Sequence, residues 1–337
     1  MEIVAGLSLK NLRPRVWDVD STEYLNSVTA VMVSFDEFRQ RPAALKRAKV
    51  HGLHAVLGVP KSSGLRIYLD NGAFACLRRG DEPAVVEYLK FVAKVRPAWY
   101  PVPADFSPLP SESRSRQRRL FDRTVAVLEA HTSNGFCPVI HPGPWFDKYL
   151  DVLERLSLNR RLALGGLVPH LLNSAGAQRR ETIALIRRAC REFPGKIHAF
   201  GIGGIVTLHL AAALGVHSAD SSGWRQRAAR GLILLRGQGE RQAVKLGSWR
   251  GRELKKDDWA ELAKCRCPAC RLNGRSGLKA DGIDGFTNRA VHNLAVLLDE
   301  AALIERHQAA GDFADWSRRR LRGHRMAGLV ELALEDT

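Results

Sequence analysis

The sequence has no hydrophobic run of the length that a membrane span requires, which is about 20 consecutive apolar residues. Its first ten residues, MEIVAGLSLK, carry an early glutamate and lack the basic-then-apolar layout of a signal peptide. These two absences predict a protein that neither enters a membrane nor is exported.

Cysteine is scarce, and its positions do not form a disulfide framework. Three of the six cysteines are scattered along the chain, at positions 76, 137 and 190. The other three fall within six residues, at 265, 267 and 270. This usage favours a reducing compartment, so we expect a cytoplasmic protein.

Acidic residues are few relative to basic ones, with 35 Asp and Glu against 52 Lys and Arg and a net charge of +17. Such an excess indicates a polyanionic partner, most commonly a nucleic acid. The alternative is an ordinary enzyme whose surface is basic without such a partner. Hydrophobic residues make up 45% of the chain, which is ample for a large buried core.

Short apolar or β-branched segments alternate with segments of helical periodicity over the first 230 residues or so. The expected strands are 2–8, 27–35, 66–72, 99–106, 137–143, 162–168, 196–203 and 216–222, with helices such as 83–95, 120–131 and 179–193 between them. This alternation predicts an α/β fold of the (β/α)8 TIM-barrel type. A doubly wound open sheet remains the alternative.

Polar residues or glycines stand at the ends of the last six expected strands. They are Asp70, Asp105, His141, Gly165 with Gly166, Gly201 to Gly203, and Asp220. In a barrel these strand ends meet on one face, where barrel enzymes place their chemistry. This convergence favours the barrel and marks that face as the candidate active site.

The chain changes character after about residue 232. Residues 233–256 are basic with an amphipathic β pattern, residues 274–285 are glycine-rich and expected to form a loop, and a helix is expected from about Thr287. We therefore expect three units: a barrel over 1–255, a metal-binding subdomain over 256–300, and a helical tail over 301–337 that packs on the barrel.

The segment KCRCPACRLNG contains Cys265, Cys267 and Cys270 in a C-x-C-x-x-C pattern. Thiolates this close suit a tetrahedral zinc ion, and Cys3His is a standard structural zinc set. His292, on the expected helix, is the preferred fourth ligand, with His307 and His324 as later candidates. Because four protein ligands leave no open position, we expect structural Zn2+ rather than catalytic zinc.

Asp70 and Asp220 are two aspartates at one barrel face. Retaining glycosidic reactions need two such carboxyl groups with separate roles. One carboxylate captures the sugar carbon covalently and the other moves protons on and off the departing group. Considered singly, a strand-end aspartate is more commonly a cap or turn residue.

A flat heterocycle would fit between Phe74 and Phe200, which follow two of these strand ends. Asp105 can accept hydrogen bonds from a guanine-like edge. Gly165, Gly166 and Gly201 allow backbone groups to approach the ring. Taken alone, the two phenylalanines would be core residues and the glycine pair a turn.

Taken in order, these motifs resemble the tRNA-guanine transglycosylase superfamily, a zinc-bearing (β/α)8 family. IYLDNGAF is similar to its D-S-G-G-F strand end, ALGGLV to its glycine-pair strand and AFGIGG to its M-G-V-G strand. GVHSADSSGW is similar to the nucleophile segment, with Asp220 at the nucleophile position. CRCPAC followed by VHN resembles the family's zinc set. The resemblance spans roughly residues 66–300.

Several positions depart from the tRNA enzymes. Ser-Ser-Gly-Trp follows Asp220 where Pro-Thr-Arg is expected, Ala104-Asp105-Phe106 replaces aspartate-glutamate-cysteine, and His141 replaces the glutamine that reads the base edge. D-N-G-A-F and D-S-S-x-W look more like the 7-deazaguanine DNA transglycosylases of DNA modification systems. The resemblance therefore implies DNA as the polymer, with 7-cyano-7-deazaguanine as the inserted base and helper proteins of such a system as candidate partners.

The implied mechanism is an exchange through a covalent intermediate. Asp220 attacks C1′ and expels guanine, Asp70 takes the N9 proton of the incoming base, and that base displaces Asp220. A duplex substrate must expose its guanine first. Arg225, Arg227 and Arg230, and the basic runs 114–119 and 318–325, are candidate phosphate contacts. The alternatives are the same exchange on tRNA, and a zinc-containing nucleic-acid-binding protein without catalysis.

Overall fold

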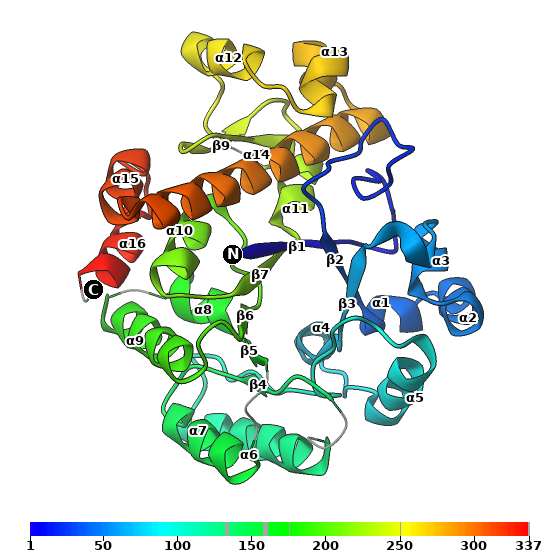
Figure 1. The fold of residues 1–337 in the computed structure, drawn as a ribbon, viewed down its shortest axis with the longest axis vertical. Helices are drawn as coiled ribbons and strands as arrows, with labels where there is room; N and C mark the ends of the chain where they lie inside the picture. Colours follow the sequence, from blue (N-terminus) through cyan, green and yellow to red (C-terminus); the bar gives the residue numbers. More distant parts are fainter. Residues whose placement is uncertain (132–134, 158–160, 175, 250, 336–337) are drawn as a thin grey trace.

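A closed ring of parallel strands forms the centre of the molecule. The computed structural model describes residues 1–131, 135–157, 161–174, 176–249 and 251–335. The ring contains β1 (Glu2–Gly6), β2 (Ala30–Ser34), β3 (Arg66–Asp70), β4 (Val139–Ile140), β5 (Leu162–Leu164), β6 (Ile197–Ala199) and β7 (Ser218–Ser221). Their order is β3-β2-β1-β7-β6-β5-β4, so the first and last strands of the barrel pair directly (Figure 1).

The ring closes between β3 and β4 through the fourth expected strand, which is irregular. Trp99 forms a parallel bridge with Tyr68 of β3, and Pro101 forms one with Cys137 just before β4. An open doubly wound sheet would leave β3 and β4 as unpaired edges. These bridges, together with the β1–β7 pairing, confirm the predicted barrel over the open sheet.

Helices follow the strands and cover the outside of the ring. Those before residue 132 are α1 (Phe35–Arg39), α2 (Pro42–His51), α3 (Leu53–Leu57), the 3-10 turn η1 (Lys61–Ser63), α4 (Ala73–Arg79), α5 (Val85–Val95) and α6 (Arg114–His131). The later ones are α7 (Phe146–Arg155), α8 (Leu167–Leu171), α9 (Gly176–Glu192), α10 (Ile205–Ala213) and α11 (Gly223–Ala229).

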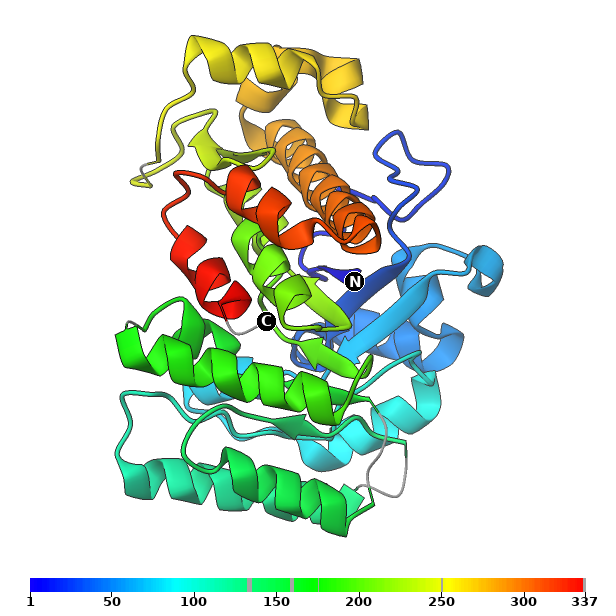
Figure 2. The same ribbon diagram turned by 60° about the vertical axis from the view of Figure 1, so that its left-hand side comes forward.

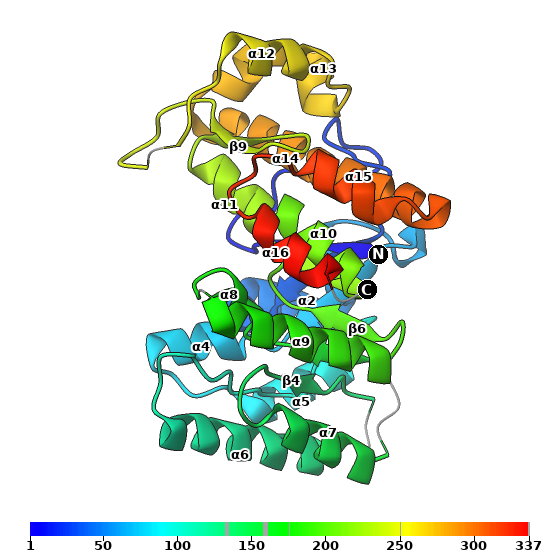
Figure 3. The same cartoon turned by 90° about the vertical axis from the view of Figure 1, so that its left-hand side faces the viewer.

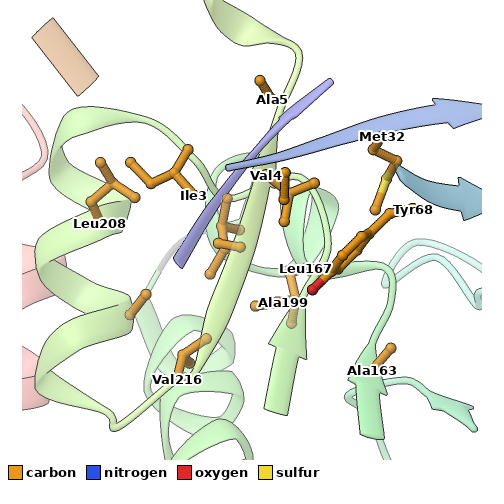
Figure 4. Packing of buried hydrophobic residues seen from close by; sticks show 14 of the residues in the cluster. Ile3, Val4, Ala5, Met32, Tyr68, Ala163, Leu167, Ala199, Leu208 and Val216 are labelled. Carbon is orange, nitrogen blue, oxygen red and sulfur yellow. The ribbon is translucent and has the colours of Figure 1, made fainter. Parts of the chain in front are cut away.

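Alternating side chains along the strands serve two separate parts of the core, as expected from the period of two in a β-strand. Ile3 of β1 packs toward Leu208 of α10, outside the ring (Figure 4). Val4 points to the other face of the strand, where Tyr68 of β3 also lies (Figure 4). The barrel interior is therefore filled with side chains, which leaves chemistry to the strand ends.

The chain after the barrel begins with an antiparallel hairpin of β8 (Leu232–Leu235) and β9 (Gly239–Gln242). Helices α12 (Lys256–Ala263), α13 (Pro268–Lys279), α14 (Gly282–Ala310), α15 (Phe313–Arg320) and α16 (Ala327–Leu334) follow. Helices α12 and α13 lie at one end of the molecule, opposite α6 and α7 (Figures 1 and 3). A small core of Ile233, Leu235, Ala243, Leu262 and Leu278 holds the hairpin to α12 and α13.

The long helix α14 joins this region to the barrel, crossing α11 and β8 (Figure 2). Its Asn293 accepts a hydrogen bond from the backbone of Leu234 and donates to the carbonyls of Trp224 and Leu232. Helix α16 packs on α10 and α9. Helix α14 continues without a break through residue 300. The division of the chain into units at residues 255 and 300 stays a prediction.

The glycine-rich segment 274–285, expected to be a loop, is largely helical. It forms the second half of α13, which is kinked at Gly274, and the start of α14. A side chain at Gly277 would collide with Asn273 and Asn288, and one at Gly285 would collide with the carbonyl of Ala280. These glycines therefore permit close packing between the two helices, and the loop prediction is wrong.

None of the described helices is long and apolar enough to cross a membrane.

Candidate active site and metal centre

Three carboxylates come together at the carboxyl ends of the barrel strands. Asp70 is the last residue of β3, Asp105 follows the irregular fourth strand, and Asp220 lies in β7. Burial raises the pKa of Asp70 to about 7, and the nearby charges of Asp105 and Asp220 add to this rise. The residue as a whole is nevertheless partly exposed. A carboxyl group with this pKa can both donate and accept a proton near neutral pH.

Asp105 is held by two neighbouring strands. The amide of Asn71 donates to its Oδ1 at 2.8 Å and also to the carbonyl of Val102 at 2.9 Å. His141 lies 3.0 Å from its Oδ2 through Nε2. Because a carboxylate oxygen accepts, this contact is a hydrogen bond in the tautomer that carries its proton on Nε2. Both oxygens of Asp105 are thus oriented before any ligand arrives.

His141 is fully buried and uses both ring nitrogens, since its Nδ1 faces the hydroxyl of Tyr149 at 3.4 Å. Burial raises the pKa of Tyr149, so that hydroxyl keeps its proton and can donate. A contact between His141 and the substrate stays a prediction. In the structure the buried ring lies behind Asp105 and supports that carboxylate.

The glycine pair after β5 packs against this support. A side chain at Gly165 would approach His141 Nε2 to 2.9 Å, and one at Gly166 would collide with the hydroxyl of Ser107. Gly166 also has φ of +68°, which disfavours any other residue. That Ser107 hydroxyl is buried and has no hydrogen-bond partner among the described residues. These glycines therefore allow the backbone after β5 to lie close to His141 and Ser107.

Asp220 is fixed by the loop after β6. The backbone N–H of Gly201 donates to its Oδ1 at 2.8 Å, and Gly201 reaches this position with φ of +74°. A side chain at Gly203 would lie 2.6 Å from the carbonyl oxygen of Asp220, so that loop can approach β7 only without one. The side chain of Asp220 is 14% exposed. It is therefore held on one oxygen and still accessible.

The two predicted stacking rings have different surroundings. Phe74, on α4, is 48% exposed and has Arg78 near its face. Phe200 is half-buried and packs edge-on against Trp99 and His198. An exposed ring such as Phe74 is available to a flat ligand, whereas Phe200 is oriented by its aromatic neighbours.

The three arginines after β7 are not equivalent. Arg225 is buried, and its guanidinium donates to the backbone carbonyls of Asn11 and Arg13, which indicates a structural role rather than a phosphate contact. Arg227 is 29% exposed and pairs with Glu240. Arg230 lies over the partly exposed ring of Trp249. Arg227 and Arg230 therefore remain available candidates for polymer contacts.

Sequence reasoning missed Asn71 and His198. Asn71 follows Asp70 in the chain, and its side-chain amide donates a hydrogen bond to Asp105. A short polar side chain at a strand end was the feature of the sequence that could have identified it. His198 lies in β6 with its Nε2 3.7 Å from Oδ1 of Asp220. Its position one strand away from the nucleophile candidate was visible only once the strands were paired.

The predicted metal ligands converge within the C-terminal region. Ligand atoms of Cys265, Cys267, Cys270 and His292 all lie within 4.8 Å of one another. The three sulfurs are 3.5, 3.8 and 3.3 Å from Nδ1 of His292. Such separations match the edges of a tetrahedron with metal–sulfur bonds of about 2.3 Å. The four groups can therefore hold a metal ion.

The surroundings of His292 also fit a metal ligand. Its Nε2–H donates to the carbonyl of Leu234 at 2.8 Å, which leaves Nδ1 unprotonated and directed at the three sulfurs. Cys267 additionally caps α13, because its sulfur accepts the N–H of Cys270. Among the described residues no disulfide joins any of the six cysteines.

Comparison with known proteins agrees with this arrangement. The family model described as queuine tRNA-ribosyltransferase matches residues 16–326. None of the curated proteins compared with the chain matches it. The family match covers the ring from β2 onward, the three carboxylates and the metal-ligand cluster, and it confirms the resemblance to the superfamily. The chain belongs to the queuine tRNA-ribosyltransferase family, a family of guanine transglycosylases that act on nucleic acid.

Proposed function

We propose that this protein exchanges guanine in DNA for a 7-deazaguanine through a covalent bond between Asp220 and the sugar. The observation that carries the proposal is the meeting of Asp70, Asp105 and Asp220 at one barrel face, with the pKa of Asp70 raised to about 7. One carboxylate then serves as nucleophile and another as a proton carrier near neutral pH.

In the first step, a carboxylate oxygen of Asp220 bonds to C1′ while the C1′–N9 bond breaks. The electron pair of that bond leaves with guanine, and protonated Asp70 supplies a proton to it. In the second step, N9 of the incoming base bonds to C1′ and its proton returns to Asp70. The bond between C1′ and the Asp220 oxygen breaks, and its electron pair returns to Asp220. Two displacements at one carbon retain the configuration.

Asp105 would hold the base in both steps. Its two oxygens are oriented by Asn71 and His141, and each retains capacity for another donor. The N1–H and exocyclic amine of guanine offer two such donors on one edge, and a 7-deazaguanine offers the same edge. Phe74 provides an exposed ring against which the base can stack.

The choice of DNA rests on sequence motifs, D-N-G-A-F at 70–74 and D-S-S-x-W at 220–224. Trp224 itself is fully buried and donates to the carbonyl of Ser221, so it does not contact a polymer. The description of the matching family favours tRNA, which is therefore the second candidate. The 7-cyano substituent and the helper proteins of a modification system also rest on the resemblance.

We further propose that the cluster of Cys265, Cys267, Cys270 and His292 binds one structural Zn2+. Three thiolates and one imidazole fill all four positions of a tetrahedral site. No position remains for water or substrate, so the ion would hold α13, α14 and the β8–β9 hairpin together. This fits a cytoplasmic setting, in which thiols stay reduced.

The deciding experiment supplies purified protein with labelled guanine or labelled 7-cyano-7-deazaguanine, and with either plasmid DNA or bulk tRNA. Nucleoside digestion and mass spectrometry then identify the polymer that gains label. We expect label in DNA with the wild type and with D147N, an exposed carboxylate on α7, but none with D220N. Label in tRNA alone would replace DNA by tRNA. Label in neither would support the non-catalytic binding protein.

A further inference from the structure

His198 is a buried histidine that the mechanism above does not use. It lies in β6 opposite Ser218 of β7, and both side chains face the barrel interior together with Asp220. Its Nδ1 is 2.9 Å from the hydroxyl of Ser218. Its Nε2 is buried, has no hydrogen-bond partner among the described residues, and lies 3.7 Å from Oδ1 of Asp220. A buried polar atom without a partner is rare enough to require an explanation.

Packing fixes the direction in which this imidazole points. The rings of Trp99, Phe200 and Tyr68 surround it, with centroids 5.0, 4.9 and 6.2 Å away. Together with the Ser218 hydroxyl, they leave the Nε2 edge directed at Asp220. The ring is therefore held by contacts on several sides.

The neighbours of the ring also decide where its proton lies. A carboxylate offers only acceptors, so the nitrogen that faces Asp220 is favourable only when it carries hydrogen. The Ser218 hydroxyl can donate to the other nitrogen. Both contacts are satisfied when Nε2 is protonated, Nδ1 is not, and Ser218 is the donor.

We propose that His198 is a positioning residue for Asp220, an inference that rests on the proposed function. The distance of 3.7 Å is longer than a hydrogen bond, and hydrogen bonds in active sites without ligand commonly tighten when substrate binds. On substrate binding, Nε2–H closes onto Oδ1, which already accepts the N–H of Gly201.

Two donors on Oδ1 assign different roles to the two oxygens of Asp220. Among the described residues, none donates a hydrogen bond to Oδ2, which leaves this oxygen to attack C1′. The same donors stabilise the negative charge that returns to Asp220 when the second base displaces it. His198 therefore assists both displacements without touching the base.

The first test measures exchange of labelled guanine by H198F, H198Q and the wild type on the polymer that the wild type labels. Phenylalanine keeps the ring packing but removes the donor, so kcat should fall by about 10²-fold with little change in KM. The side-chain amide of glutamine can donate from nearly the same place as Nε2 and should restore most of kcat. A merely structural role would not give this pattern, because H198Q disturbs the aromatic packing more than H198F does.

The second test needs no activity. Nitrogen chemical shifts of 15N-labelled histidine identify the protonated ring nitrogen of His198, and H198F assigns the signal. We expect the Nε2–H form in the wild type and a loss of this preference in S218A and in D220A.

These outcomes separate the two proposals. An inactive wild type on both polymers contradicts the proposed function, and the spectra then still decide whether His198 donates toward Asp220. Wild-type kcat in H198F beside an inactive D220N, or an Nδ1–H form in the wild type, would overturn the role of His198 and leave the exchange reaction standing.

Discussion

Asp70 lies beside two other carboxylates, and this placement sets the pH at which it holds a proton. Burial is the largest cause that raises its pKa to about 7, and the charges of Asp105 and Asp220 add to it. A hydrogen bond from Ser34 acts in the opposite direction. Asp70 is thus protonated in part at neutral pH, which suits a group that must give and then take a proton.

Release of guanine should therefore slow as the pH rises above about 7. The protonated fraction of Asp70 falls about ten-fold per pH unit above its pKa, and the single-turnover rate should follow it. Rapid-quench measurements between pH 6 and 9 test this. D70N should be slower by about 10²- to 10⁴-fold and flat over the same range. A wild-type rate that rises steadily to pH 9 would exclude Asp70 as the acid.

Asp70 should also lower the free energy of unfolding at alkaline pH. Its pKa is higher in the folded protein than the ordinary value of 3.8, so the folded state binds more protons between about pH 4 and 7. Stability then falls as the pH rises through this window. D70N removes the charge and should be more stable than the wild type at pH 8, by on the order of 2 kcal/mol, with the gain shrinking toward pH 4.

Urea denaturation at pH 5 and pH 8 measures this difference. D147N provides the matched control, because Asp147 is an exposed carboxylate on α7 and its replacement should give no comparable gain at either pH. An equal effect of D70N at both pH values would show that charge is not the cause.

At the scale of elements, α14 connects the metal-ligand cluster to the barrel through consecutive residues. His292 directs one ring nitrogen to the cysteines and the other to the carbonyl of Leu234, and Asn293 holds β8 and α11. A metal in the cluster therefore ties the hairpin to the helix that crosses the barrel.

Removal of one ligand should release the metal and loosen this region. We expect about one equivalent of zinc in the wild type by metal analysis and none in C267S, with a lower melting temperature. C190A, which changes a cysteine of α9 distant from the cluster, should keep its zinc. Full zinc content in C267S would contradict the four-ligand site.

A second connection of α14 is a buried ion pair toward α15. Glu300 is fully buried and accepts hydrogen bonds from Arg320 and from His209 of α10. Burial alone would raise the pKa of Glu300, but the bonds from Arg320 and His209 outweigh it and lower the pKa to about 2. Removing one partner of such a pair leaves a buried charge uncompensated.

E300Q should therefore lower the free energy of unfolding at pH 7 by about 3 kcal/mol. Because the pKa is lowered on folding, the contribution of Glu300 is present above about pH 4.5 and is lost as the pH falls toward 2. The gap between E300Q and wild type should narrow accordingly in acid. D299N, next to it on the same helix but half exposed and paired with Arg236, should change stability by less than about 1 kcal/mol.

At the scale of the whole molecule, the barrel was predictable because its strand ends carry the polar residues. Asp70, Asp105 and Asp220 each end an apolar segment, and in a barrel the carboxyl ends of all strands surround one face. The fourth strand was less regular than expected, since Pro101 and Pro103 have no N–H to donate to a neighbouring strand.

The parts of the site that sequence reasoning missed depend on pairing between strands. His198 acquires its neighbours only through the register that sets it opposite Ser218, and the role of His141 depends on Tyr149 behind it. Arg225 looked like a phosphate contact because charge in a sequence does not reveal burial. The glycines of 274–285 indicated a loop because glycine is common in flexible loops. Glycine also occurs where two helices pack closely, as these do, and the sequence alone does not distinguish the two cases.

The charge of +17 gives a prediction that concerns the whole surface. Binding of a polyanion releases counterions, so the logarithm of the affinity should fall linearly with the logarithm of the salt concentration. Fluorescence anisotropy with duplex DNA, single-stranded DNA and tRNA at several salt concentrations measures these slopes. A partner that is not a nucleic acid would leave all three slopes shallow and the affinities weak.

Substitution of Arg227 tests which face of the protein binds the polyanion. Arg227 lies in α11, shortly after Asp220, and is partly exposed, so R227Q should weaken binding to all sequences and reduce the slope by about one. Lys94 is exposed near the end of α5, just before the strand segment that begins at Trp99, and so lies toward the opposite end of the barrel. K94Q should leave the slope unchanged. Equal effects of the two variants would mean that the polymer does not bind at the face that holds the three carboxylates.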